Sequence, residues 1–119
     1  MKYILLIHHV DESEIDEAYR VELLAESVQL CNDLHQNRQY IDAAPLHPKS
    51  ETISVKVRDG KRLVTDGPFA ETREYVGGYF MVDAENLEAA IDIAGRIPSA
   101  RIGTVEVRPV RVVEGLPQV

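Results

Sequence analysis

Apolar and polar residues follow one another in this chain in patterns that predict two helices and an antiparallel sheet. The first segment, Tyr3 to Ile7, is apolar on both alternating faces, which is typical of a central strand that is covered on both sides. From about Ser13 to Gln36 apolar residues recur at three- and four-residue steps, and this period predicts a long helix. The predicted buried stripe of this helix comprises Ile15, Tyr19, Leu23 or Leu24, Val28, Cys31 and Leu34.

The middle of the chain predicts further strands, two of them joined by a tight turn. Residues 53–57 alternate apolar and polar side chains, and Asp59-Gly60 is a strong signal for the hairpin turn that follows. The returning strand covers residues 62–65, and residues 77–83 form the next strand. We expect these segments to belong to the sheet of the first strand.

The last third of the chain predicts a second helix and a final strand. Asn86 is a suitable cap for a helix from Leu87 to about Gly95, and residues 104–112 form the last strand. The inward face of this helix is predicted to comprise Leu87, Ala90, Ile91 and Ala94. The order strand, helix, strands, helix, strand predicts an α+β fold, a sandwich of ferredoxin-like type.

Two helices cover only one face of such a sheet, whereas the first strand is apolar on both faces. A second copy of the chain is the simplest cover for the other face, so the pattern predicts a homodimer.

The composition limits the classes of protein to which the chain can belong. Its 119 residues fit a single domain, 1–119, and 45% of them are apolar, which is enough for a hydrophobic core. The net charge of −7 and the lack of a visible Lys/Arg cluster argue against nucleic-acid binding. Cys31 is the only cysteine, which excludes an intramolecular disulfide and a thiolate zinc cluster. No metal-ligand spacing stands out, and neither a metal nor a cofactor is predicted.

The first apolar run is too short for a signal peptide or a membrane span. The sequence therefore predicts a cytoplasmic protein without a membrane partner.

The stretch from Thr65 to Tyr79 has the highest local density of turn-forming, charged and aromatic residues. Asp66-Gly67-Pro68 forces a chain reversal, and Phe69 follows as an expected apolar anchor of the loop. Charged side chains come next, and Gly77-Gly78 opens the following strand. A charged, anchored loop between two strands suits a binding site, and it equally suits an ordinary structured connection.

The segments TDGPFAETRE, GGYF and GTVEVRPV resemble the YCII-related superfamily, in the subgroup named after the tetrapeptide DGPF. The similarity extends from the first strand to about Arg111. It implies a dimeric α+β barrel, and strand parity then suggests a cleft between the sheets that Tyr79 and Arg108 reach. Most members of this family have no established activity. Some members of the wider group are thought to use a histidine on the first helix, but this helix carries only His35, near its end, so that role is not transferred.

His47 and Asp66 are the leading candidates for chemistry. Each lies in a tight proline-containing turn beside a strand end, and PLHP and TDGPF both look like motif positions of the subgroup. A carboxylate within hydrogen-bond reach of an imidazole fixes its tautomer and raises its pKa, which gives an acid or base near neutral pH. In the alternative interpretation Asp66 accepts backbone hydrogen bonds in its own turn, and His47 is solvated. The sequence does not show whether the two side chains meet.

Other side chains are candidates for ligand binding. Glu71 and Arg73 are suited to contact a charged ligand, or to form a surface ion pair with each other. Phe69, Tyr79 and Arg108 complete the predicted ligand-binding set. His8 and His9 are adjacent on a strand and point to opposite faces, so they are not expected to share a metal ion, and one of them facing the cleft stays open.

Two hypotheses for the function follow. In the first, a homodimer binds a small organic molecule and performs cofactor-free acid–base chemistry of lyase or isomerase type. The resemblance adds that one YCII-like relative is associated with removal of chloride from an aromatic ring. In the second, the protein is a non-catalytic accessory or sensor. Here the resemblance implies an extracytoplasmic-function sigma factor as partner, because genes of the subgroup often lie beside genes for such factors.

Overall fold

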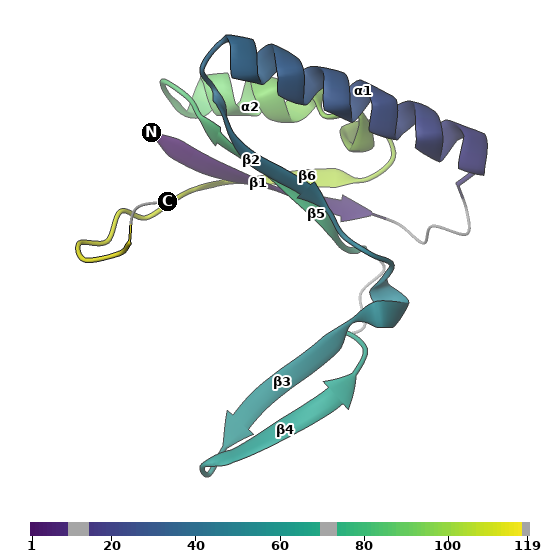
Figure 1. Cartoon of the computed structure of the whole chain (residues 1–119), viewed down its shortest axis with the longest axis vertical. Helices are drawn as coiled ribbons and strands as arrows, with labels where there is room; N and C mark the ends of the chain where they lie inside the picture. The colour runs from purple at the N-terminus through teal and green to yellow at the C-terminus, as the bar shows by residue number, and fades with distance from the viewer. Residues whose placement is uncertain (10–14, 70–73, 118–119) are drawn as a thin grey trace.

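The structure of the chain is a computed structural model that describes residues 1–9, 15–69 and 74–117. These residues form six strands and two α-helices (Figure 1). The strands are β1 (Lys2–His9), β2 (Tyr40–Pro45), β3 (Ile53–Arg58), β4 (Lys61–Asp66), β5 (Tyr75–Asp83) and β6 (Thr104–Pro109). The α-helices are α1 (Glu17–Gln36) and α2 (Leu87–Arg96), and two 3-10 helices are η2 (Lys49–Glu51) and η3 (Pro98–Arg101).

Four strands form the main sheet, in the order β2-β5-β1-β6, and every neighbouring pair is antiparallel. Both α-helices lie on the same side of this sheet (Figure 1). The order and the two crossovers are those of a ferredoxin-like fold, so the predicted α+β class is confirmed. The sheet of the single chain is open and does not close into a barrel.

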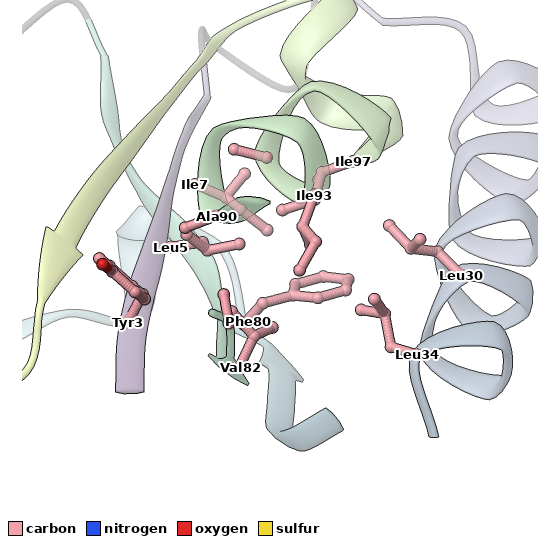
Figure 2. Packing of buried hydrophobic residues seen from close by; sticks show 12 residues of the cluster. Tyr3, Leu5, Ile7, Leu30, Leu34, Phe80, Val82, Ala90, Ile93 and Ile97 are labelled. Atoms are coloured by element: carbon pink, nitrogen blue, oxygen red, sulfur yellow. The ribbon is translucent and has the colours of Figure 1, made fainter. Parts of the chain in front are cut away.

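The core lies between the sheet and the helices. β1 points Tyr3, Leu5 and Ile7 toward the helices, and Leu5 is completely buried. Phe80 of β5 lies opposite Leu5 in the register, and Figure 2 shows its ring near side chains of both helices. The other face of the sheet is not fully covered in the single chain. Ile4 and Leu6, which alternate with the buried residues of β1, have intermediate exposure.

Helix α1 differs from the prediction in its start and in its buried stripe. It begins at Glu17, where the carboxylate of Asp16 accepts a hydrogen bond from the backbone N–H of Ala18 at 3.4 Å. The predicted start at Ser13 lies outside the described residues. Its buried residues are Leu23, Leu30 and Leu34. Leu24 and Val28 are exposed, because this part of the helix stands over a cavity and not over packed side chains.

Helix α2 confirms the predicted cap and corrects the predicted face. The side chain of Asn86 accepts a hydrogen bond from the backbone N–H of Ala89 at 2.9 Å. The buried residues are Ala90, Ile93 and Ala94. Leu87 and Ile91, which the pattern placed inward, are exposed because the buried stripe is centred on Ile93, to one side of them.

Strand β6 is shorter than predicted and ends at Pro109 instead of Val112. Its partner is the cause: Pro109 lies opposite Tyr3, and the last contact is a hydrogen bond from the N–H of Val110 to the carbonyl of Lys2. Beyond this point β1 offers no residues with which a longer strand could pair.

Strands β3 and β4 form a hairpin of their own, residues 53–66, which we call the arm. The predicted turn is confirmed, since Asp59 and Gly60 have φ of 52° and 72°, as a tight hairpin turn requires. The expectation that these strands join the main sheet is wrong. Within the described part of the chain they pair only with each other, and they project from the main sheet and its helices (Figure 1). The radius of gyration is 16.1 Å, against about 13.5 Å for a compact chain of this length.

Candidate functional site

A cavity of about 490 Å³ lies between α1 and the sheet, beside the end of β1. Its volume is in the range of sites for small organic molecules. Most of its wall is apolar and comes from α1, β2, β5 and the segment after η3. The larger apolar residues of the wall are Ile7, Ile15, Leu23, Leu24, Val28, Tyr40, Leu46, Phe80 and Ile102.

His9 provides a titratable group in the wall of this cavity. Its Nε2 forms a hydrogen bond with Oγ of Ser99 in η3 at 3.2 Å. Its ring meets the ring of Tyr75 edge to face, with 6.3 Å between centroids. A Cβ atom at position 77 would lie 2.7 Å from Nδ1 of His9, so only glycine there leaves room for the ring. The imidazole is therefore fixed on three sides.

The alternation of side chains along β1 explains why His9 reaches the cavity. His8, one residue earlier, points to the opposite face of the sheet, where its Nε2 and Oε1 of Glu106 are 2.5 Å apart. The β1–β5 register shifts between Ile7 and His8, so that His8 lies opposite Val76. The two histidines therefore face opposite sides of the sheet, as the strand parity predicted. The sequence left open which of them faces a cleft; position 9 follows from parity once Leu5 and Ile7 face the helices.

Other polar side chains of the wall come from α1. Arg20 adds a cationic group, and Ser27 and Asn32 add neutral ones. The hydroxyl of Ser27 donates to the carbonyl of Leu23 at 2.9 Å. Cys31 also lines the cavity, and burial raises the pKa of its thiol above the ordinary value of 9.0, which keeps it protonated near neutral pH.

The uncovered face of the main sheet carries a second polar group. The hydroxyl of Tyr79 donates to Oδ2 of Asp42 at 2.6 Å, and this hydrogen bond raises the pKa of Tyr79 above its ordinary value of 10.0. Arg108 is on the same face, opposite Ile4 in the β1–β6 register. Tyr79 and Arg108 thus share the face that the strand parity predicted, and Tyr79 also contributes to the cavity wall.

The comparisons with known proteins agree over almost the whole chain. The YCII-related domain matches residues 1–114. This chain belongs to the YCII-related family. A relative, an uncharacterized protein of Rhizobium meliloti (strain 1021), is 32% identical over 118 residues, which cover 92% of this chain and 91% of the relative.

In this YCII-related chain His47 and Asp66 lie in different local environments. His47 is 86% exposed, and its Nδ1 is 3.2 Å from Oε2 of Glu51 in η2. Asp66 ends β4, is exposed, and lies opposite Ile53. Among the described residues no hydrogen bond or ion pair joins His47 to Asp66, and neither lines the cavity. Their proposed partnership stays a prediction.

The remaining predicted ligand-binding residues lie in the loop after the arm. Phe69 is 82% exposed, so the expectation that it anchors the loop is wrong; its ring does not pack into the core. Glu71 and Arg73 lie outside the described residues. The N–H of Gly67 donates to the carbonyl of Thr52 at 2.8 Å, which continues the pairing of the two strands beyond Ile53 and Asp66.

Two further features of the YCII-related chain bear on its chemistry. Within residues 1–9, 15–69 and 74–117, no three His, Cys, Asp or Glu side chains are grouped so that they can hold a metal ion. Neither helix in that part of the chain has the length and apolarity needed to span a bilayer.

Proposed function

We propose that this YCII-related protein binds a small, mainly apolar organic molecule in the cavity beneath α1, with His9 as the group that exchanges a proton with it. The observation that carries the proposal is the fixed imidazole of His9 in the wall of a cavity of about 490 Å³.

The cavity favours a ligand with an apolar body and one polar end. Apolar groups line most of the wall, and they would hold such a body by removing it from water. His9 and Ser99 are adjacent in the wall and would form hydrogen bonds with the polar end of the ligand. Arg20 in the same wall favours a ligand with a negatively charged or strongly accepting group.

Cofactor-free acid–base chemistry is the reaction type that suits these residues. An imidazole titrates near neutral pH, and one that is fixed by a hydroxyl and by close packing is oriented toward a bound molecule. Proton abstraction next to a carbonyl underlies many isomerisations and eliminations, and it needs a base together with a group that stabilises the negative charge on the enolate oxygen. In this proposal His9 is the base and Arg20 of the same wall is the cationic group. In this proposal His9 has the proton-transfer role that the sequence analysis predicted for His47.

The second candidate function is binding without turnover, as in an accessory or sensor protein with a sigma-factor partner. The exposure of His47 and its separation from the cavity wall favour this alternative over a His47–Asp66 dyad. Both candidate functions include the prediction that the protein is cytoplasmic and belongs to the DGPF subgroup.

Both candidates include a homodimer. The face of the main sheet opposite the helices exposes part of Ile4, Leu6 and Met81, apolar side chains that a second sheet would remove from water. The sheet-to-sheet dimer proposed from the sequence would bury them.

Binding is tested by filling the cavity. Val28→Trp places a large ring at the cavity wall, and Val21→Trp, on an exposed part of the same helix, is the matched control. The probe is the fluorescent anion 8-anilinonaphthalene-1-sulfonate, followed by its fluorescence and by protection of Cys31 from a thiol reagent. We expect Val28→Trp alone to abolish binding and protection. Equal binding by both variants would place the probe elsewhere and contradict the proposed site.

Turnover is tested separately with a panel of small ketones and hydroxylated aromatic acids in D₂O. Deuterium uptake at carbon is followed by proton NMR in the wild type, in His9→Gln and in the neighbouring control His8→Gln. Exchange that is lost only in His9→Gln supports an acid–base role. If the wild type binds the probe but catalyses no exchange, the result supports the second candidate, binding without turnover. Exchange that survives in His9→Gln would exclude His9 as the base.

A further inference from the structure

The arm exposes an apolar surface that none of the described residues of its own chain covers. Val55 and Val64 lie opposite each other in the β3–β4 register, and Ile53 and Val57 have the same parity. These four side chains, which we call the apolar face of the arm, are between 56% and 62% exposed. Every residue of β4, and every residue of β3 except Ser54, is exposed as well.

An isolated hairpin of two strands is marginally stable in water, because it has too little buried surface to offset the entropy of ordering. The described contacts that hold the base of the arm are local: the hydroxyl of Ser54 donates to the carbonyl of Gly67 at 2.7 Å, and Lys49 lies over the ring of Tyr75, 5.4 Å from its centroid. Neither contact covers the apolar face. An ordered arm of this kind therefore needs a partner surface.

The charge of the arm indicates the kind of partner. Residues 53–66 carry four basic and two acidic side chains, a net charge of +2. Because the net charge of the whole chain is −7, the residues outside the arm have a net charge of −9. Lys56, Arg58, Lys61 and Arg62 surround the tip and form a basic cluster that the sequence prediction did not include. Arg62 lies on the apolar face, opposite Val57, whereas Lys56, Arg58 and Lys61 lie on the other face of the hairpin and would border the contact. A basic, apolar arm on an acidic chain is complementary to a second copy of the same chain.

We propose that the arm of each chain reaches across to a second copy and packs its apolar face against the acidic main part of that copy, so that two arms clasp the dimer. This inference rests on the homodimer of the proposed function and adds the element that holds the two chains together. Both arms become covered in one symmetric assembly, as an isologous dimer requires.

The test uses the full-length chain in sedimentation velocity across a dilution series. The variant is the double substitution Val55→Ser and Val64→Ser, and the control is Leu63→Ser, which removes an apolar side chain from the other face of the same hairpin. We expect the double variant to raise the dimer dissociation constant on the order of a hundredfold, and the control to change it by less than about threefold. Added salt should weaken the wild-type dimer, because opposite charges meet.

Hydrogen exchange of the amides of residues 53–66 gives a second readout that does not depend on a variant. We expect protection that is high in the dimer and lost on dilution to monomers. If the double variant does not fold, as judged by circular dichroism, Val57→Ser repeats the sedimentation test with a smaller change.

The outcomes separate the two proposals. A wild type that is monomeric at every concentration overturns the homodimer and the clasp together. A dimer whose dissociation constant is the same in the double variant, Val57→Ser and Leu63→Ser overturns the clasp alone. Binding of duplex DNA or of anionic vesicles that the double variant loses, with dimerisation intact, also overturns it and assigns the arm to that other partner.

Discussion

Strand β1 of the main sheet and strand β3 of the arm both carry apolar side chains at every second position, but these side chains are buried in the main sheet and exposed in the arm. Strand β1 buries Tyr3, Leu5 and Ile7 beneath two helices, whereas β3 presents Ile53, Val55 and Val57 to solvent. The two strands differ at the intervening positions, which are apolar in β1 and polar in β3, but not in the positions compared here. Both sets are apolar residues at every second position, and a period of two fixes only that a strand has an apolar face, not which element covers it. In this chain the connections decide, because both helices follow strands of the main sheet and none follows the arm.

Replacing a leucine by alanine at one position in each region gives the largest expected contrast. Leu5→Ala empties a fully buried site and should lower the free energy of unfolding by about 2–5 kcal/mol. Leu63→Ala, on the exposed arm, should change it by no more than about 0.5 kcal/mol. Urea denaturation of both variants measures the two values. A cost above that range at Leu63 would mean that the arm is part of the cooperative core after all.

Two glycines sharpen the same contrast at the level of the backbone. A Cβ at Gly103 would lie only 2.1 Å from the carbonyl oxygen of His8, so Gly103→Ala must move the backbone and should cost about 1–3 kcal/mol. Gly60, at the tip of the arm, has open space around it but a φ of 72°, and Gly60→Ala should cost roughly 1 kcal/mol, confined to the arm. Denaturation midpoints give the first cost. Hydrogen exchange of the arm amides gives the second, and a loss of protection throughout the main sheet in Gly60→Ala would contradict the separation.

The smallest expected effect concerns the uncovered face of the main sheet. This face carries a hydrogen bond between two side chains, Tyr79 and Asp42, whereas no such bond is described on the apolar face of the arm. Because the pKa of Tyr79 is raised by its hydrogen bond to Asp42, the contribution of this bond is fully present below pH 10.0 and is lost as pH rises through the raised pKa. Asp42→Asn should therefore lower the pKa of Tyr79. A pH titration of the labelled Tyr79 ring by carbon NMR measures it, with Asp33→Asn, whose carboxylate binds Gln29, as the control. An unchanged pKa in Asp42→Asn would exclude the hydrogen bond as the cause.

Local signals in the sequence were sufficient for most of the fold. The α+β class, the cap at Asn86 and the turn at Asp59-Gly60 depend on neighbouring residues, and all three are confirmed. The predicted positions of Val28 and Ile91 failed for a different reason. The periodicity of a helix shows which residues share a face, but it does not show whether other side chains pack against that face. Val28 faces a cavity, and no local sequence pattern indicates a cavity.

The candidate site was harder to predict, because it depends on residues that are distant in sequence. His9 meets Ser99 across ninety positions, and the glycine that makes room for its ring lies on β5. The strong local motifs, PLHP and TDGPF, favour His47 and Asp66, but both residues are exposed and neither lines the cavity. Strand parity together with the direction of the first helix was the one signal that could have favoured His9 over His8.

The pair His8 and His9 also gives the protein two spectroscopic reporters on one strand. The imidazole of His9 senses the cavity, and that of His8, beside Glu106, senses the far side of the sheet. Their ring protons resonate in the same uncrowded region of a proton NMR spectrum. One titration therefore distinguishes a molecule that enters beneath α1, which shifts the His9 signals, from a protein that docks on the open face, which shifts those of His8.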